Sequence, residues 1–272
     1  MLDCFYRRFS SVVEQRFRKA WVVGSIPTIG FYFLIKTPMD EHDFDKSMGG
    51  KAYEKVLGLV GSYYHVLLKE LAQGVAGATK DVSNPLICDL GCGTGVSTGY
   101  LLSAAPKAWV LAVDVSAKML EAVPDDLMFS LQIEWRNLDM AEALEGCPDD
   151  TFDIIANCYA VHNLPPGKRQ RIFSLIARKL KKGGLFISAD KIAVNDEAGH
   201  QAMLRERLAQ YESLQQMGYA RQSKEWIEHC KHDETIRLTE SELSQSLVKL
   251  GFGVVNFGPR VGMYELAWAL RD

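Results

Sequence analysis

Three glycines at alternate positions follow an aspartate within residues 88–97, CDLGCGTGVS. Asp89 stands two residues before Gly91, and Gly93 and Gly95 follow. Glycine loses more conformational freedom on folding than any other residue, so such a cluster indicates either a tight turn or a backbone that a ligand approaches closely. The segment lies between an apolar run and a helix-like stretch, which is the setting of nucleotide-binding loops.

The glycine spacing argues against a dinucleotide ligand. Dinucleotide loops have the pattern G-x-G-x-x-G, whereas here the third glycine comes one residue early and Val96 takes the expected place. The carboxylate of Asp89 would repel a pyrophosphate but can pair with an ammonium group. We therefore expect a ligand that resembles a nucleoside carrying an amino acid, and not a dinucleotide cofactor of an oxidoreductase.

Two further carboxylates end the next two strand-like runs. Asp114 comes 19 residues after Gly95 (114 − 95), at a place where related folds bind ribose hydroxyls. Asp139, in RNLDM, ends the third run, where an adenine amino group could be bound. Each has a plainer alternative: Asp114 could cap a helix, and Asp139 could be a solvated turn residue.

Short apolar runs alternate with helix-like stretches through the middle of the chain, which predicts a mostly parallel, doubly wound α/β sheet. Strands are expected at 85–90, 108–116, 131–139, 152–162 and 185–192, and helices at 96–105, 117–123 and 167–184. Ser116 is expected to cap the second helix, and Gly183 to end the third.

The alternation of predicted strands and helices stops after residue 193. Residues 194–237 read as a helical insert that would form a lid together with the mostly helical residues 40–80. A helix over 239–252 has a capping box of Thr239 and Glu242. The tail, 253–270, reads as two strands joined at Gly258-Pro259.

The motifs DLGCGTG and NLDM, with Asp114 between them and five strands in this order, resemble the class I S-adenosylmethionine-dependent methyltransferases over roughly residues 50–272. The resemblance implies a Rossmann-like sheet of seven strands, the last antiparallel, with S-adenosylmethionine as cofactor. It places Asp89 along the methionine part and Asp114 at the ribose. The full set of expected cofactor-binding residues is Tyr53, Asp89, Gly91, Cys92, Gly93, Gly95, Asp114, Val115, Asp139, Met140 and Asn157. For Asn157, a local backbone hydrogen bond is an equal alternative.

Two rival functions keep the same cofactor. The segments 52–61, 157–170 and 241–252 are also similar to those of the carboxy-S-adenosylmethionine synthases, which modify the cofactor itself. That subfamily holds an added carboxylate with an arginine of the insert, and Arg221 is the candidate here. A non-catalytic scaffold or regulator that binds the cofactor is the other rival, although the intact glycine loop argues against it.

Methyl transfer requires mainly that acceptor and methyl group be aligned and that water be excluded. A base is needed only if the acceptor arrives protonated. His162, in YAVHNLPP, is the candidate base, unless it only packs or caps its loop; Tyr159 is expected to shape the pocket wall. Asp190 and Lys191 end the fifth strand, at the edge where such sheets bind ligands. The expected acceptor is a small molecule in a mostly apolar, lidded pocket.

Two polar clusters have plain interpretations. His229, Cys230, His232 and Asp233 invite a metal site, but their spacing is not a standard zinc pattern, so we expect a solvated helix end and no metal. The charged run KRQR, 168–171, is expected to face solvent at the start of a helix.

Composition limits the class of protein. The chain has 272 residues, 47% of them hydrophobic, and a net charge of -3, so a nucleic-acid partner is not expected. Six cysteines without a C-x-x-C pair predict reduced thiols and a cytoplasmic location. We expect a methyltransferase domain over 49–272, preceded by an amphipathic and apolar extension over 1–48. The extension would pack on the core or on a partner subunit in a homodimer, lie on a membrane surface, or be a removable targeting peptide.

Overall fold

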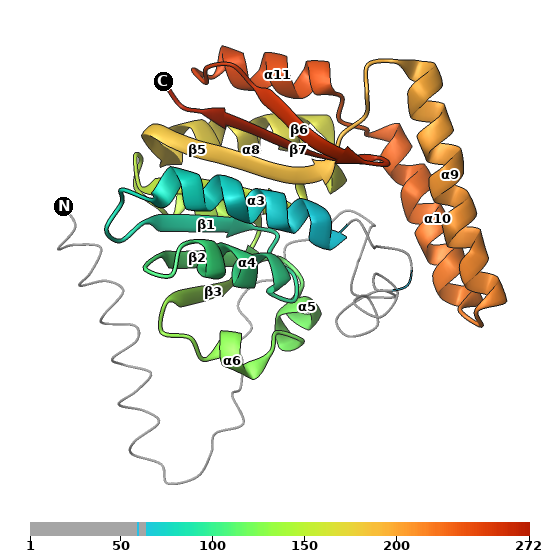
Figure 1. Ribbon diagram of the computed structural model, residues 1–272, viewed down its shortest axis with the longest axis horizontal. Coiled ribbons are helices and arrows are strands. Elements are labelled where there is room, and N and C mark those ends of the chain that lie inside the picture. The colour runs from blue at the N-terminus through green and yellow to red at the C-terminus, as the bar shows by residue number, and fades with distance from the viewer. Residues whose placement is uncertain (1–58, 60–63) are drawn as a thin grey trace, which may run out of the picture. The chain divides into compact units, whose positions relative to one another are not determined.

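The computed structural model describes residue 59 and residues 64–272, and these form a seven-stranded sheet with helices on both faces (Figure 1). The strand order is β3-β2-β1-β4-β5-β7-β6. The strands are β1 (Leu86–Leu90), β2 (Trp109–Asp114), β3 (Ile133–Asn137), β4 (Phe152–Cys158), β5 (Leu180–Lys191), β6 (Asn256–Val261) and β7 (Tyr264–Leu270). The first five are parallel, and β7 is antiparallel to both of its neighbours. The predicted fold class is therefore confirmed.

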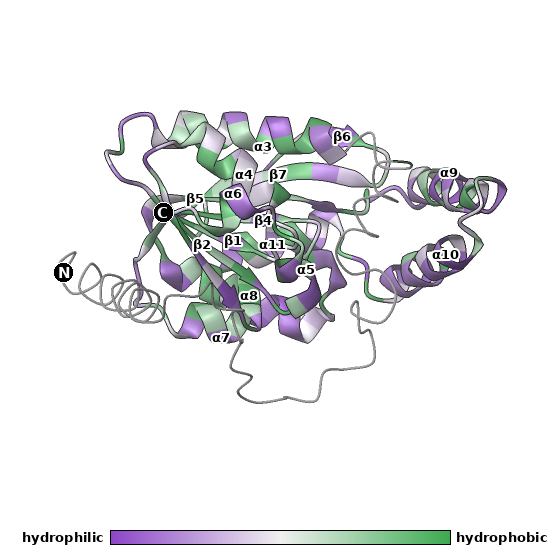
Figure 2. Ribbon diagram, turned by 90° about the horizontal axis from the view of Figure 1, so that it is seen from below, coloured by the Kyte–Doolittle hydropathy of each residue, from purple (hydrophilic) through white to green (hydrophobic). Residues whose placement is uncertain are grey.

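Each face of the sheet carries its own helical layer and apolar core. One layer consists of α3 (Tyr64–Thr79), α4 (Val96–Ala104) and α5 (Ala117–Glu121), and the other of α7 (Met140–Glu145), α8 (Pro166–Lys179) and α11 (Glu240–Lys249). Successive strand residues point to opposite faces, so Ile87 joins the first core and Cys88 the second. Figure 2 shows the apolar strands enclosed between helices whose outer faces are polar.

The predicted strand over 152–162 is too long, because β4 ends at Cys158 and a 3-10 turn follows over Val161–Asn163. Two further predicted boundaries are wrong, and both of these errors lie where strands pair over long sequence distances. Helix α8 ends at Lys179, not at Gly183, and residues 180–184 begin β5. There Gly183, with φ of 72°, donates its N–H to the carbonyl of Arg271. The turn of the last hairpin lies at Gly262, with φ of 59°, whereas Gly258-Pro259 falls inside β6 at an irregularity in its pairing with β7.

The predicted N-terminal caps at Ser116 and Thr239 are confirmed. Ser116 accepts a hydrogen bond from the N–H of Met119 at the start of α5, and Thr239 accepts one from the N–H of Glu242 at the start of α11. Gly251, with φ of 84°, follows the last turn of α11. Such caps satisfy backbone groups that a helix end leaves without partners.

The insert after β5 is a pair of helices, α9 (Glu197–Gln216) and α10 (Ala220–Thr235), which pack against each other beyond one end of the sheet (Figure 1). Tyr211 and Trp226 are nearly fully buried between them, with ring centroids 5.2 Å apart. These aromatic side chains therefore hold the helix pair together. The helical character of the insert is confirmed, while its action as a lid stays a prediction.

The predicted N-terminal extension, 1–48, and the expected cofactor contact of Tyr53 lie outside the described residues. Among the described residues, no helix combines the length and apolarity that a membrane crossing requires. A short helix, α6 (Asp125–Met128), and one turn of 3-10 helix, η1 (Val161–Asn163), complete the described elements.

Candidate active site

The glycine loop joins β1 to α4 in a conformation that only glycine adopts without strain. Gly91, Gly93 and Gly95 have φ of 74°, 55° and 85°. A Cβ on Gly91 would lie 2.2 Å from the Cβ of Ala160, and one on Gly95 would lie 2.9 Å from the Trp135 ring. Packing therefore requires two of the three glycines, in addition to the turn itself. A Cβ on Gly93 would meet only the Met119 methyl group, at 3.0 Å.

Asp89 is fully buried beneath this loop. Its Oδ2 accepts hydrogen bonds from the hydroxyls of Ser97, at 2.8 Å, and Thr98, at 2.7 Å. Its Oδ1 has no hydrogen-bond partner in the described structure. Burial raises the pKa of this carboxyl to about 6, against the lowering effect of the two hydroxyls. A buried acceptor without a donor is costly, so Oδ1 is suited to receive a donor from a ligand.

Asp114 ties the end of β2 to the glycine loop. Its Oδ2 accepts the N–H of Gly93 and its Oδ1 accepts the N–H of Ser116, each at 2.8 Å. The helix-capping alternative is thus partly realised, since Ser116 is the cap of α5. Each carboxylate oxygen has a second lone pair, so contact with ribose hydroxyls stays a prediction. The neighbouring Val115 is 46% exposed.

The expected adenine-side residues lie next to the same loop. Asp139 is exposed and caps α7, where its Oδ1 accepts the N–H of Ala141 at 2.7 Å. The Met140 methyl group lies 3.1 Å from the position that a Cβ on Gly91 would take. Cys92 is buried, and burial raises the pKa of its thiol well above the ordinary value. The cysteine is therefore neutral at pH 7.

At the ends of β4 and β5, polar side chains are buried and bonded to one another. Asn157 donates from Nδ2 to Ser188, at 2.8 Å, and to Asp190, at 2.7 Å, and its Oδ1 accepts the N–H of Val161 at 3.0 Å. Asn157 is thereby directed at β5 and η1, so the backbone-bonding alternative holds for it. Contact between Asn157 and a cofactor stays a prediction.

His162 and Asp190 form a buried dyad. Asp190 accepts four hydrogen bonds: from Asn157, from the N–H groups of His162 and Lys191, and from Nδ1 of the His162 ring. Because an ionised carboxylate only accepts, Nδ1 carries the proton and a neutral imidazole has its lone pair on Nε2. That nitrogen lies 3.9 Å from Asp233 Oδ2. Ala160, two residues before His162, packs on Gly91, so the segment that leads into η1 contacts the glycine loop.

Comparison with known proteins agrees with this geometry. Residues 87–184 match the family model described as a methyltransferase domain. The carboxy-S-adenosyl-L-methionine synthase of Campylobacter jejuni is 24% identical over 240 residues, which are 87% of this chain and 97% of that protein. The trans-aconitate 2-methyltransferase of an Azoarcus species is 36% identical over 118 residues, 43% of each chain.

The fold is also found in a solved structure. A SAM-dependent methyltransferase from Archaeoglobus fulgidus superposes with a TM-score of 0.55 at 14% identity, covering 81% of this chain and all of the other. Residues 87–184 therefore form a methyltransferase domain.

The carboxylate beneath the glycine loop fits the amino-acid part of S-adenosylmethionine. The unpartnered Oδ1 of Asp89 is an acceptor, and the amino-acid part of S-adenosylmethionine has an ammonium donor. The same ammonium would favour the ionised carboxylate. On this ground we propose that Asp89 binds the methionine end of the cofactor.

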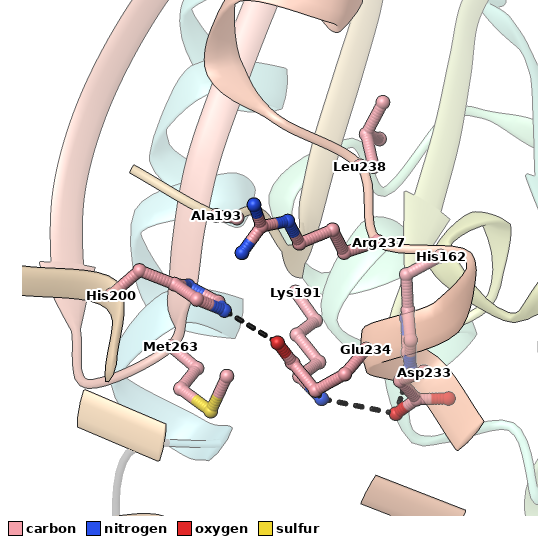
Figure 3. A pocket seen from close by; sticks show the side chains of 9 residues that line it. All are labelled: His162, Lys191, Ala193, His200, Asp233, Glu234, Arg237, Leu238 and Met263. Carbon is pink, nitrogen blue, oxygen red and sulfur yellow. Dashed lines mark hydrogen bonds and ion pairs between the residues drawn. The ribbon is translucent and has the colours of Figure 1, made fainter. Parts of the chain in front are cut away.

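A small hollow lies beside the dyad of the methyltransferase, between the end of β5 and the insert (Figure 3). It is lined by His162, Lys191, Ala193, His200, Asp233, Glu234, Arg237, Leu238 and Met263. Lys191 Nζ lies 3.2 Å from Asp233 Oδ2, and His200 Nε2 lies 2.6 Å from Glu234 Oε2. Most of these side chains are ionisable. The expected mostly apolar acceptor pocket, which would also involve residues 40–80, stays a prediction.

The carboxylate of Asp233 stays ionised in this setting. Burial raises its pKa, but the electrostatic interactions with His229, His162 and Lys191 together outweigh burial and lower the pKa below the ordinary value. Burial also opposes the charge on Lys191, yet Asp233 and other acidic groups raise its pKa on balance. The acidic partners of Lys191, Asp233 and Glu234, therefore both lie on α10.

Sequence reasoning missed several residues of this region. His200, Glu234 and Arg237 showed no motif, because they meet only when the insert folds back on β5. The assignment of KRQR to solvent is wrong for Arg169, which is fully buried. The Arg169 guanidinium donates to backbone carbonyls of residues 164, 236 and 237 and thereby fixes the segment that follows α10.

The aromatic residues have positions that no pattern indicated. Tyr159 has φ of 55°, an uncommon backbone conformation for a bulky residue. Its ring stacks on Tyr64, with centroids 4.8 Å apart, and meets the edge of Tyr264 at 5.1 Å. Tyr159 therefore joins α3 to β7 close to the dyad.

Proposed function

We propose that the chain transfers the methyl group of S-adenosylmethionine to a small polar acceptor that arrives protonated, with His162 as the general base. The observation that carries this proposal is the dyad. Asp190 fixes the His162 ring with its lone pair on Nε2, and His162 lines the hollow at the end of β5. A positioned histidine of this kind contributes about 10²–10⁴-fold to proton transfer.

The bound cofactor would supply a methyl group activated by the neighbouring sulfonium. The acceptor's lone pair forms the new bond to carbon, the electrons of the broken carbon–sulfur bond remain on sulfur, and the acceptor's proton goes to His162 Nε2. Asp190 then stabilises the imidazolium, as the carboxylate does in other histidine–carboxylate pairs. Asp89 and Asp114 would hold the methionine and ribose parts, with the glycine loop close to the ligand.

The lining of the hollow supports a polar acceptor. Its ionisable side chains are paired with one another or with neighbours, Lys191 with Asp233, Arg237 with Glu197 and His200 with Glu234, and an acceptor with charged or hydrogen-bonding groups could exchange with these pairs. We propose that α9 and α10 cover the acceptor and exclude water. A net charge of -3 gives no support to a nucleic-acid substrate.

The test begins with mass analysis of any small molecule that copurifies, followed by a screen of acids, amines and phenols with a labelled methyl donor. For an acceptor so found, His162→Ala should reduce turnover and leave cofactor affinity unchanged. His232→Ala, on the neighbouring helix, is the matched control. Full turnover in the folded His162 variant would remove the histidine from the mechanism.

A carboxy-S-adenosylmethionine synthase activity is the second candidate, since the synthase of C. jejuni matches nearly end to end. The arginine expected to hold the added carboxylate is a poor fit: Arg221 is 71% exposed and pairs with Glu225 along α10. Arg207, on α9, is the better candidate, because it is 4% exposed and donates to the hydroxyls of Tyr211 and Tyr264. A carboxylated cofactor bound to the purified protein would favour the synthase activity over methyl transfer.

We also propose a reducing, cytoplasm-like compartment. The five described cysteines are free thiols: Cys88, Cys92, Cys147, Cys158 and Cys230. Contact of residues 1–48 with a membrane or with a second subunit stays part of the proposal. Size-exclusion chromatography with light scattering, with and without these residues, would test the dimer.

A further inference from the structure

Three side chains from distant parts of the chain direct metal-ligating atoms at one point. His162 lies in η1, and His229 and Asp233 lie one helical turn apart on α10. One ligand atom from each lies within 4.8 Å of the other two. Asp233 Oδ2 is 3.9 Å from His162 Nε2 and 3.6 Å from His229 Nε2. Ligand atoms bound to one tetrahedral Zn²⁺ at about 2.1 Å are about 3.4 Å apart, so small side-chain movements would suffice.

The surroundings of His162 are those of a metal-binding histidine. Ligating histidines usually donate their second ring N–H to a carboxylate, which fixes the tautomer and the ring orientation. Here His162 Nδ1 donates to Asp190, and Asp190 is itself held by Asn157. Nε2 is the nitrogen left to bind a metal.

Asp233 supplies a second, independent observation. The residue is 4% exposed, and its Oδ1 has no hydrogen-bond partner within the described part of the chain. A buried carboxylate oxygen without a donor is costly, and a cation would satisfy it. Lys191 binds the other oxygen, Oδ2, at 3.2 Å, and leaves Oδ1 without a donor. Oδ2 is also the oxygen nearest the two histidines, so rotation of the carboxylate would bring Oδ1 to a bound ion.

The charges around the cluster leave room for a divalent cation. Asp190, Asp233 and Glu234 contribute three negative charges, and Lys191 contributes one positive charge. With neutral imidazoles the local sum is −2 (−3 + 1). Buried charges of one sign are unfavourable unless they are compensated.

We propose that His162, His229 and Asp233 bind a divalent transition-metal ion such as Zn²⁺. Two imidazoles and one carboxylate suit such an ion and leave a position open for water or an oxygen ligand. The sequence interpretation rejected a metal because it compared only residues 229–233, whereas the fold brings in His162 from 67 residues earlier (229 − 162). Since the ion would take the Nε2 lone pair, it would compete with the proposed role of His162 as base.

The test uses the full-length protein, freed of metal by a chelator, without cofactor or acceptor. Co²⁺ is titrated while its visible absorption bands are followed, and Zn²⁺ affinity is then measured by competition with a chromogenic chelator. We expect one ion per chain. His229→Ala and Asp233→Asn should each weaken binding at least about tenfold, the size of effect seen when even indirect supports of a metal site are lost. His232→Ala, on the same helix, should bind like the unchanged protein.

Circular dichroism would confirm that each variant is folded. If Asp233→Asn fails to fold after losing its ion pair with Lys191, His229→Ala alone carries the test. Absence of Co²⁺ binding by the unchanged protein, or equal binding by the folded His229→Ala protein, would overturn the proposal. Cofactor titrations in the presence of chelator test the methyltransferase function separately.

Discussion

The buried carboxylate under the glycine loop makes cofactor binding dependent on pH. Asp89 has its pKa raised to about 6 by burial, so a fraction of the protein is protonated there in mildly acidic solution. If the ligand's ammonium group needs the ionised form, the apparent dissociation constant scales as 1 + 10^(pKa − pH). S-adenosylmethionine should therefore bind about elevenfold more weakly at about pH 5 than above about pH 7.

The same shift has the opposite effect on stability. The folded-state pKa of Asp89 is above the unfolded value of 3.8, so the folded protein binds the proton more tightly. The contribution of Asp89 to the free energy of unfolding is therefore most favourable at a pH below its unfolded-state pKa, and it is lost as the pH rises to about 6. For this shift in pKa the free energy of unfolding changes by about 3 kcal/mol. Asp89→Asn should therefore stabilise the ligand-free protein at neutral pH. It should also weaken cofactor binding by about 10–100-fold, the loss of one charge-assisted hydrogen bond.

Calorimetric titrations across this pH range, at constant ionic strength, are the assay. Asp89→Asn should remove the pH dependence, and 5′-methylthioadenosine, which lacks the amino-acid part, should show none with either protein. A pH-independent affinity for S-adenosylmethionine, or an unchanged pH dependence in the folded variant, would refute the assignment of Asp89 to the ammonium group.

Three other substitutions separate local causes. Gly91→Ala should lower the free energy of unfolding by about 1–3 kcal/mol more than Gly183→Ala does. Both glycines have positive φ, but only at Gly91 would the added Cβ contact other atoms. Equal losses in chemical denaturation would contradict this explanation. Arg169→Met should lower the free energy of unfolding by about 3 kcal/mol through unpaired carbonyls, whereas exposed Lys168→Ala should change it by less than about 0.5 kcal/mol. His162→Ala should lower kcat about 10²–10⁴-fold, and an unaltered pH–rate profile would exclude it as base.

Local sequence signals were sufficient for the sheet and the glycine loop. The alternation of apolar runs with helical stretches predicts the parallel strands, and the acidic residue before three glycines predicts a tight loop, in which the structure gives all three glycines positive φ. These features depend on a few consecutive residues. The caps at Ser116 and Thr239 were predicted for the same reason.

Long-range contacts account for what the sequence did not reveal. The start of β5 pairs with the end of β7, so residues that read as a helix end became strand. The Arg169 guanidinium is held by the carbonyls of residues 236 and 237, from a segment 67 residues later in the chain, as well as by the nearby carbonyl of Leu164. The cluster of His162, His229 and Asp233 likewise exists only because α10 returns to the end of β5. The spacing of these residues along the chain does not indicate that they lie in contact.

Titration calorimetry with S-adenosylmethionine and with S-adenosylhomocysteine, at neutral pH with chelator present, tests the central claim most directly. Binding of both, in the micromolar range and at one per chain, is the expected result, with loss of affinity in Asp114→Ala. No binding of either ligand by folded full-length protein would contradict the assignment of the glycine loop as the cofactor site.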